Sequence, residues 1–284
     1  GECVPYARYG EMLESVSSQI EAVREQIETG VVHENVVGAM PPGAARNAVD
    51  CAFWDLNAKS SGISAYKLVC EHPPRPVTTA TTISLGTASK MADAAKAVAE
   101  YPSLKVKLGG EGDIERIHAV TDAAPESRII LDANEAWSAD NISQFMLEAA
   151  KANVALIEQP LPKGNDAILA DIPHPVPICA DESAHTADDL ADLVGRYDCI
   201  NVKLDKTGGL TEAIKMRRRA HEMGFSVMVG CMVGTSLSMA PAVLLAQDAE
   251  FVDLDGPLIL EKDRANGLEY VKSLVAPPTP KLWG

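Results

Sequence analysis

Charged residues stand at the ends of five short apolar runs, and the interval between them is nearly constant. From Lys107 onward, each step to the next charged residue is 22 to 26 residues long. One β-strand, one α-helix and two loops occupy about that length, so each step predicts one βα unit. The strand ends of a parallel barrel face one mouth, where such barrels carry their chemistry. The residues concerned are Lys105 and Lys107, Asp132, Glu158, Asp181 and Lys203.

The βα rhythm from residue 77 onward predicts an α/β fold with eight strands and seven helices. This is a (β/α)7β barrel, a modified TIM-like barrel. We expect strands at 77–84, 103–108, 128–132, 154–158, 177–181, 199–204, 225–229 and 251–254. We expect helices at 88–100, 113–123, 138–152, 164–171, 186–194, 210–223 and 234–246.

Residues 1–75 do not follow this rhythm. Apolar residues spaced by three and four predict a helix over 11–28, and a second helical stretch covers 44–68 with a break near Gly62. This segment has the character of a helical cap. Its first residues read as the end of a strand with no strand before it, so we expect part of an N-terminal sheet to be missing.

Composition narrows the function classes. The net charge of −15 argues against nucleic acid and against anionic membranes as partners. No apolar run approaches the ~18 residues of a membrane span, and no export signal is visible. Six scattered cysteines without a CxxC pair indicate reduced thiols. We therefore expect a cytoplasmic protein.

Three acids provide a candidate metal site. Asp132, Glu158 and Asp181 end three consecutive expected strands, and Mg²⁺ prefers oxygen ligands with positions left open for water or substrate. No histidine or cysteine occupies these positions, which disfavours zinc. The alternative is that the acids cap helices or form salt bridges. Three acids in register favour the metal.

Two lysines provide candidate acid/base groups. Lys107 and Lys203 belong to strands two and six of eight, roughly opposite across the mouth, with the acids between them. A lysine base needs a lowered pKa, which a divalent cation or the nearby ammonium of Lys105 would provide. The alternative is that they are surface lysines. Two bases on opposite faces of one carbon allow racemisation or epimerisation next to a carboxylate.

A pair of acids ends the last expected strand. Asp253 and Asp255 both face inward and would repel each other unless a cation lies between them. A substrate ammonium fits best, and a second metal or a salt bridge with a lysine are the alternatives. Gly208–Gly209 and the turn 230–234 are glycine turns, where we expect the backbone to approach a ligand.

Taken together, these motifs resemble the enolase superfamily, in its muconate-lactonising branch. The matching segments are Lys105-Val-Lys107, Leu-Asp132-Ala-Asn134, Ile-Glu158-Gln-Pro160, Ala-Asp181-Glu182-Ser183, Asn201-Val-Lys203-Leu-Asp205-Lys-Thr-Gly-Gly and the cap stretch 44–55. The resemblance implies a remnant of an α+β capping domain at 1–75, a catalytic barrel at 76–260 and a C-terminal segment at 261–284 that returns to the cap. The family's cap opens with strands and a mobile loop that are absent here, which leaves substrate choice open.

Within the superfamily, the Asp253-Leu-Asp255 pair resembles that of dipeptide epimerases, in particular those of the L-Ala-D/L-Glu type in murein peptide recycling. The resemblance implies an isomerase with one Mg²⁺ at Asp132, Glu158 and Asp181. It implies Lys107 and Lys203 as acid/base groups and Lys105 near the substrate carboxylate. Asp253 and Asp255 would hold the dipeptide ammonium, and the pocket would be lined by Cys231, Met232 and Val233.

Two other functions stay open. One is another superfamily reaction, namely N-succinylamino acid racemase, o-succinylbenzoate synthase or cycloisomerase activity. The other is a non-catalytic barrel that binds a ligand or partner. Barrels of this superfamily often form homo-oligomers, and no surface feature of the sequence sets the oligomeric state.

Overall fold

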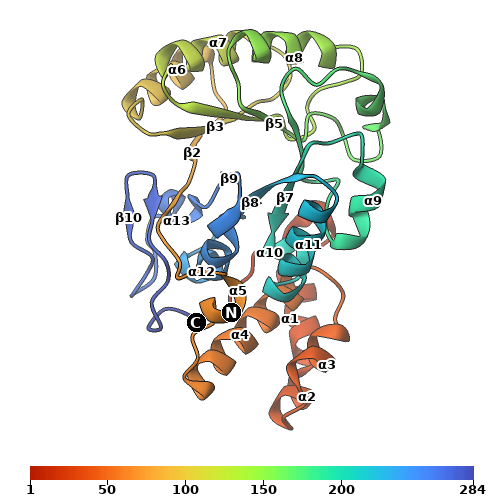
Figure 1. Ribbon diagram of the computed structural model, residues 1–284, viewed down its shortest axis with the longest axis vertical. Helices are drawn as coiled ribbons and strands as arrows, with labels where there is room; N and C mark the ends of the chain where they lie inside the picture. The colour runs from red at the N-terminus through yellow and green to blue at the C-terminus, as the bar shows by residue number, and fades with distance from the viewer.

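The computed structural model describes residues 1–284 and contains an eight-stranded parallel sheet curled into a barrel (Figure 1). The strands lie in chain order, each paired with the next, which confirms the predicted fold class. They are β2 (Thr81–Ile83), β3 (Ser103–Lys107), β4 (Arg128–Asp132), β5 (Leu156–Glu158), β6 (Ile178–Ala180), β7 (Cys199–Lys203), β8 (Ser226–Gly230) and β9 (Phe251–Val252).

The first and last strands meet at a short seam. The backbone N–H of Ala80 donates to the carbonyl of Val252 at 2.8 Å, and Leu254 donates to Thr79 Oγ1 at 2.7 Å. The single strand expected at 77–84 is therefore wrong in its extent. Its first two residues form β1 (Val77–Thr78) in another sheet, and the chain then turns to join the barrel.

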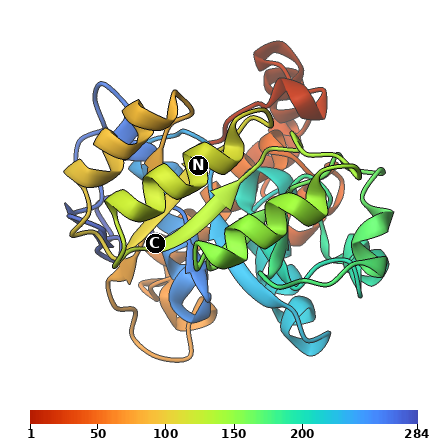
Figure 2. The ribbon, with the colours of Figure 1, turned by 90° about the horizontal axis from the view of Figure 1, so that it is seen from above.

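Helices cover the outside of the barrel, and Figure 2 shows α6, α7 and α8 lying across its outer face. Two expected helices are much shorter than predicted, because 164–171 holds only a 3-10 helix over Ala167–Asp171 and 186–194 divides into a 3-10 turn over Ala187–Asp189 and one α-helical turn over Leu190–Leu193. The elements are α6 (Ala88–Ala97), α7 (Asp113–Ala123), α8 (Ile142–Lys151), η2 (Ala167–Asp171), η3 (Ala187–Asp189), α9 (Leu190–Leu193), α10 (Leu204–Thr207), α11 (Leu210–Glu222), α12 (Ser236–Leu245), η4 (Ala246–Asp248) and α13 (Gly256–Ile259).

The cap is built from short helices around one long helix. The helix expected over 11–28 is broken at Val23, whose N–H bonds to Ile20 three residues back and tightens the turn. The break near Gly62 is confirmed, and α3 was not predicted. The elements are η1 (Ala7–Tyr9), α1 (Leu13–Ala22), α2 (Arg24–Glu28), α3 (His33–Gly38), α4 (Ala44–Ser61) and α5 (Tyr66–Val69).

The C-terminal segment runs back to the cap. It forms β10 (Tyr270–Val271) and β11 (Leu274–Val275), which build a small antiparallel sheet with β1. The indole of Trp283 then donates to the carbonyl of Cys51 at 2.8 Å, and Gly284 donates to Asp55. These bonds fasten the end of the chain to α4, beside the N-terminus (Figure 1).

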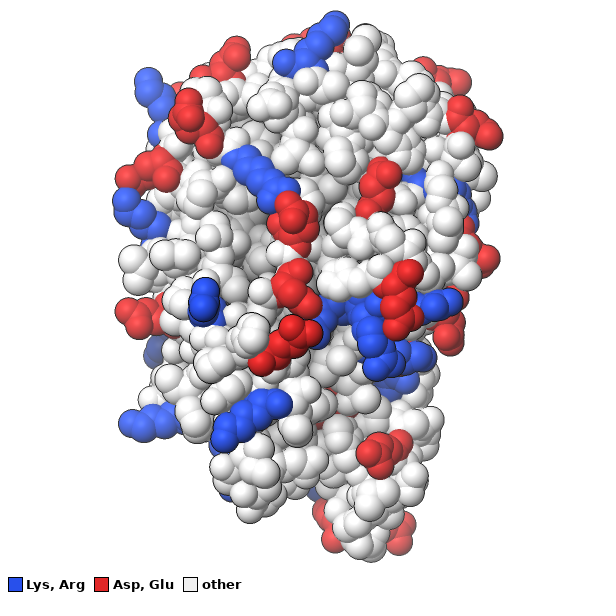
Figure 3. All heavy atoms as spheres, in the orientation of Figure 1, with Lys and Arg blue, Asp and Glu red and all other residues white.

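Surface charge is mixed on the face shown in Figure 3, where acidic and basic side chains lie among each other. All six cysteines carry free thiols, as their spacing predicts. None of the helices is both long and apolar enough to span a membrane.

A layer of buried side chains inside the barrel supports the mouth. Ile130, Leu156 and Cys179 belong to one buried cluster that fills the interior. Because strand side chains alternate, the residues two positions later point into the barrel as well. Those residues are Asp132, Glu158 and Asp181, so the strand period places all three carboxylates one layer above the apolar interior.

Candidate active site

The three strand-end acids converge as predicted. Asp132 and Glu158 are direct register partners on β4 and β5, and Asp181 follows β6 immediately. Each is at most 2% exposed. Buried carboxylates are stable only when cations or hydrogen bonds compensate them, so this cluster requires positive charge.

Lys105 provides part of that charge from the barrel centre. It is 1% exposed, and its Nζ atom lies 3.1 Å from Asp132 Oδ2 and 2.7 Å from Glu158 Oε2. The same ammonium donates to Asp253 Oδ2 at 2.7 Å. Lys105 therefore joins the acids expected to bind metal to one of the acids expected to bind substrate.

Lys107 and Lys203 reach the mouth from β3 and β7, four strands apart. Lys107 donates to Asp132 Oδ2 at 2.6 Å, and Lys203 donates to Asp181 Oδ2 at 2.6 Å. Their exposures differ, because the side chain of Lys107 is 33% exposed and that of Lys203 is 8% exposed. Both line one pocket of about 280 Å³, with Asp181 between them in sequence and on its wall.

The electrostatics of Lys203 differ from the sequence expectation of a lowered pKa. Burial alone would lower the pKa of Lys203, but the carboxylates of Asp181 and Glu158 outweigh it and raise that pKa above its usual range. Conversely, burial would raise the pKa of Asp181, but Lys203 and Lys206 hold it well below its usual value. The carboxylates thus keep Lys203 charged, and a bound cation that draws on the same carboxylates would weaken this hold.

The donor chemistry of the acids fits a hard cation. All three offer only oxygen, and Glu158 Oε2 makes no hydrogen bond of good geometry although Lys105 is close. No group of three or more acidic, histidine or cysteine side chains is gathered into a ready ligand cage, since lysine ammoniums lie among the oxygens. Asp132, Glu158 and Asp181 are the residues that would hold the ion.

Asp253 and Asp255 face the same pocket from the end of β9. Asp253 is paired with Lys105, which is the salt bridge considered as an alternative in the sequence. Asp255 has no ion pair; its Oδ2 accepts a hydrogen bond from the backbone N–H of Thr82 at 2.8 Å. Burial and the charge of Asp253 raise the pKa of Asp255 to about 6. An added cation would be stabilised beside Asp255.

The loop after β8 completes this wall of the pocket. Cys231, Met232 and Val233 all line it, as the resemblance implies. Burial and the neighbouring charges of Asp253 and Asp255 raise the pKa of the Cys231 thiol far above its usual value. The raised pKa keeps the thiol protonated, which disfavours the thiolate that a nucleophilic cysteine needs.

The cap contributes residues to the mouth that sequence reasoning missed. Tyr6 and Tyr9 line the same pocket, with their rings 5.1 Å apart. Arg8, between them, forms ion pairs with Glu135 and, at 3.3 Å, with Glu182. These acids follow β4 and β6, so one cap side chain bridges two of the strand ends that carry the candidate ligands.

Supporting residues around the acids were also missed. Lys206 is fully buried and donates to Asp181 Oδ1 at 2.6 Å. Asn201 donates to Glu158 Oε1 at 2.8 Å, and Gln159 accepts from the backbone N–H of Asp181 at 2.8 Å. For Asn201 the sequence does contain a signal. Asn201 lies two residues before Lys203 on one strand, so both side chains point to the inward face.

Backbone strain is concentrated beside two of the candidate ligands. Asn134, Glu135 and Gln159 have positive φ values of 44°, 66° and 35°. Non-glycine residues rarely adopt this conformation, and it persists only where surrounding contacts enforce it. Here the loops after Asp132 and Glu158 are enforced by hydrogen bonds such as that from the N–H of Glu135 to the carbonyl of Gln159 at 2.8 Å.

Comparison with known proteins gives the family. Residues 90–279 match the enolase C-terminal domain-like family, and residues 1–70 match the mandelate racemase/muconate lactonizing enzyme N-terminal domain. An N-acetyl-D-glutamate racemase from Pseudoalteromonas sp is 45% identical over 286 residues, which cover 100% of this chain and 90% of the relative. An L-Ala-D/L-Glu epimerase from Escherichia coli (strain K12) is 45% identical over 272 residues, covering 95% of this chain and 85% of the relative.

Solved structures agree. An enolase family member from Agrobacterium tumefaciens with homology to dipeptide epimerases, bound to sodium and L-Ala-L-Glu, is 56% identical with a TM-score of 0.99, covering 100% and 87% of the two chains. A dipeptide epimerase from Cytophaga hutchinsonii, complexed with Mg and D-Ala-L-Val, is 25% identical with a TM-score of 0.88, covering 98% and 82%. The chain belongs to the mandelate racemase/muconate lactonizing enzyme family of the enolase superfamily.

Proposed function

We propose that this chain is an isomerase that epimerises a dipeptide of the L-Ala-D/L-Glu type at the α-carbon of its C-terminal residue. The supporting geometry is a pocket that combines two lysines on opposite strands with an acid that no cation neutralises. A relative and a structural neighbour are named L-Ala-D/L-Glu epimerase, and another neighbour, described as having homology to dipeptide epimerases, is bound to L-Ala-L-Glu. We further propose Mg²⁺ as the cofactor, held by Asp132, Glu158 and Asp181, and a cytoplasmic location consistent with the free thiols.

The two lysines provide the proton transfers in this mechanism. One of Lys107 and Lys203, as the neutral amine, takes the α-proton, and the electron pair of the broken C–H bond moves into the adjacent carboxylate. The other, as the ammonium, returns a proton to the opposite face of the same carbon, which inverts it. Held by Asp132, Glu158 and Asp181, Mg²⁺ would supply positive charge that stabilises the charge developing on the substrate carboxylate. Lys105 adds a fixed positive charge at the barrel centre.

Asp255 is the observation that carries the choice of a dipeptide. Lys105 already neutralises Asp253, whereas Asp255 has only a neutral backbone partner within a buried wall. The N-terminal ammonium of a dipeptide would supply the missing charge. An N-acylated amino acid has no such ammonium.

The second candidate is racemisation of an N-acyl glutamate, because a relative with this name matches as well as the epimerase does. Both reactions need the same lysines and the same acidified α-carbon, so they differ only at the amino end of the substrate. Incubation with L-Ala-L-Glu or with N-acetylglutamate in D₂O distinguishes them. We expect deuterium at the glutamate α-carbon and a mixture of epimers for the dipeptide. Turnover of N-acetylglutamate alone would favour the second candidate.

A further inference from the structure

Helix α4 of the cap holds the segment 205–211, which follows Lys203 almost directly in the sequence. The guanidinium of Arg46 donates to the carbonyl of Gly208 at 3.1 Å and also to the carbonyl of Thr207. Arg46 forms no ion pair. Its hydrogen bonds at this junction are both made to backbone carbonyls. One side chain of the cap thereby fixes two successive peptide groups of the barrel.

Two more residues of α4 hold the same segment. Asn47 donates to Asp205 Oδ1 at 2.8 Å. Asp50 is fully buried and accepts from the backbone N–H of Thr211 at 2.9 Å and from its hydroxyl at 2.6 Å. Thr211 lies in the first turn of α11, where a carboxylate is favoured by the helix dipole. We call Arg46, Asn47 and Asp50 the α4 clamp.

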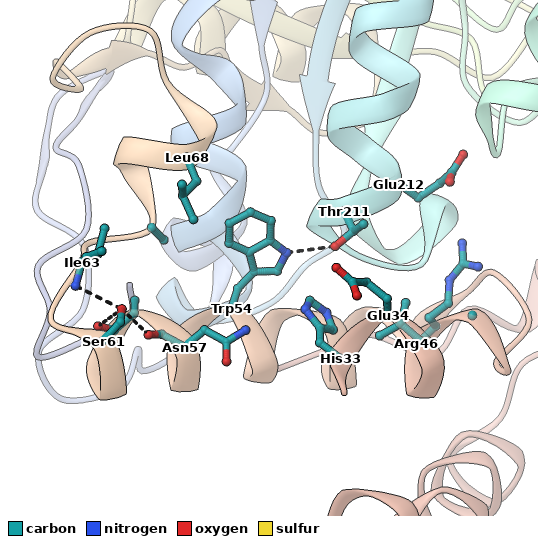
Figure 4. A pocket seen from close by; sticks show the side chains of 14 residues that line it. His33, Glu34, Arg46, Trp54, Asn57, Ser61, Ile63, Leu68, Thr211 and Glu212 are labelled. Atoms are coloured by element: carbon teal, nitrogen blue, oxygen red, sulfur yellow. Dashed lines mark hydrogen bonds between the residues drawn. The ribbon is translucent and has the colours of Figure 1, made fainter. Parts of the chain in front are cut away.

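Figure 4 shows the surroundings of the clamp. Arg46 and Trp54 of α4 and Thr211 and Glu212 of α11 all line one cavity of about 480 Å³. The indole of Trp54 donates to Thr211 Oγ1 at 3.0 Å. Because a cavity adjoins the contact, apolar packing does not cover this side of the junction, and polar bonds carry the contact there.

Two glycines shape the held segment to fit α4. Gly208 and Gly209 have φ values of 79° and 113°. A β-carbon at Gly208 would lie 2.9 Å from Arg46 Nη2, and one at Gly209 would lie 2.7 Å from Asp50 Cγ. Real side chains do not approach so closely. The glycines therefore admit the cap helix, and the approach of a ligand to them stays a prediction.

The held segment reaches the proton-transfer site on one side only. Helix α10 begins directly after Lys203, and its Lys206 donates to Asp181 Oδ1 at 2.6 Å and to the carbonyl of Asn201 at 2.9 Å. Lys107 lies on β3 instead, and its partners at the mouth are Asp132, the last residue of β4, and Asn134 in the loop that follows. None of the clamp's bonds reaches that loop.

We propose that the α4 clamp positions Lys203, and not Lys107, for proton transfer, which makes Arg46 and Asp50 positioning residues. This inference rests on the proposed function. Loosening the clamp would impair the proton transfer on only one face of the α-carbon. Inversion needs both lysines, so epimerisation would fall equally in both directions. Exchange of the α-proton without inversion needs only the lysine that faces it, so this exchange separates the two lysines.

The test compares such exchange in D₂O, starting separately from L-Ala-L-Glu and from L-Ala-D-Glu. Lys203→Ala and Lys107→Ala define the two one-sided patterns. We expect Arg46→Gln and Asp50→Asn to slow exchange from one epimer about fivefold more than exchange from the other. The more strongly slowed epimer should be the one whose exchange Lys203→Ala abolishes. Arg46→Lys should restore part of the loss. Lys59→Gln removes another cation from α4, one that pairs only with Asp55, and should change neither rate.

A substrate-free measurement separates the inference from the proposed function. In Arg46→Gln we expect backbone amides of 205–211 to exchange with deuterium about tenfold faster, while those of β3 stay protected as in a folded barrel. Equal loss for both epimers, the Lys107→Ala pattern, or unchanged amide exchange in 205–211 would overturn the clamp. Absence of any α-proton exchange by the unaltered protein would instead overturn the proposed function, and the amide exchange would still decide whether the clamp holds.

Discussion

Gly209 packs so closely on Asp50 that a β-carbon at Gly209 would lie 2.7 Å from Asp50 Cγ. The φ of Gly209 is 113°, a value that other residues rarely adopt. We expect Gly209→Ala to lower the free energy of unfolding by about 2–4 kcal/mol, because it adds backbone strain and displaces a buried carboxylate. Unfolding in urea, followed by circular dichroism, measures the change.

Gly195→Ala is the matched control for this substitution. Gly195 also has a positive φ, 81°, but no heavy atom lies within 4 Å of the position of its added β-carbon. We expect a loss of only about 1 kcal/mol, from backbone strain alone. Equal losses for the two variants would show that the contact with Asp50 contributes nothing.

Replacing Asp255 tests recognition of the substrate's amino end. Asp255→Asn keeps an oxygen that can accept from the N–H of Thr82, but it removes the negative charge. We expect kcat/KM for L-Ala-L-Glu to fall about 100-fold, since a buried ammonium would lose its ionic partner. Any turnover of N-acetylglutamate should change by less than about threefold, because this substrate carries no ammonium. An equal fall for both substrates would contradict the assigned role.

Metal binding should be visible in stability without any substrate. Because the ion would bind only the folded protein, Mg²⁺ at 100 times its Kd should add about 2.7 kcal/mol of stability. We expect EDTA to reverse the accompanying rise in Tm and Asp181→Asn to abolish it. Asp171→Asn, which changes an exposed acid, should retain the full rise. A Tm of the unaltered protein that does not respond to Mg²⁺ would count against a metal held by these three acids.

Stability should also depend on pH through Asp205. Burial raises the pKa of Asp205 to about 7, although hydrogen bonds from Val4 and Asn47 partly oppose this. In the unfolded chain its pKa is about 3.9, so the folded protein holds an extra proton between these values. The contribution of Asp205 is therefore most favourable below about pH 4 and is lost as the pH rises through 7.

Asp205→Asn removes this dependence. An amide keeps an oxygen that can accept from Val4 and Asn47, and it carries no charge at any pH. We expect the variant to gain stability relative to the unaltered protein as the pH rises from 4 to 8, by about 2–4 kcal/mol in urea unfolding. A difference between the two proteins that stays constant with pH would show that Asp205 is ionised in the folded state throughout this range.

The sequence allowed the barrel to be predicted because its strands obey a strict local rule. Most strands are short apolar runs, and the alternation of side chains along them fixes which residues point inward. Asp132, Glu158, Asp181 and the three lysines could thus be assigned to one mouth without a structure. The residues expected to contact substrate after β8 and β9 were predicted from the same rule and from the resemblance. They line the same pocket and are Cys231, Met232, Val233, Asp253 and Asp255. The roles of these residues stay predictions.

The remaining features depend on contacts between segments far apart in the sequence. Nothing local to Arg8 indicates that it reaches Glu135 and Glu182, and nothing local to Gly209 indicates that a cap helix packs on it. The break at Val23 was missed because apolar spacing alone continues through it. The raised pKa of Lys203 was missed because it depends on the balance between burial and two carboxylates.

The seam between the first and last strands has a consequence for ligand binding. Asp255 follows β9, whereas its backbone partner Thr82 belongs to β2, so the expected contact with the substrate's amino end bridges the two edges of the sheet. A bound dipeptide would fasten the barrel shut at this seam, where the hydrogen bonds from Ala80 to Val252 and from Leu254 to Thr79 close it. Binding of the dipeptide would then slow the opening of β2, although β2 lies far along the chain from Asp255.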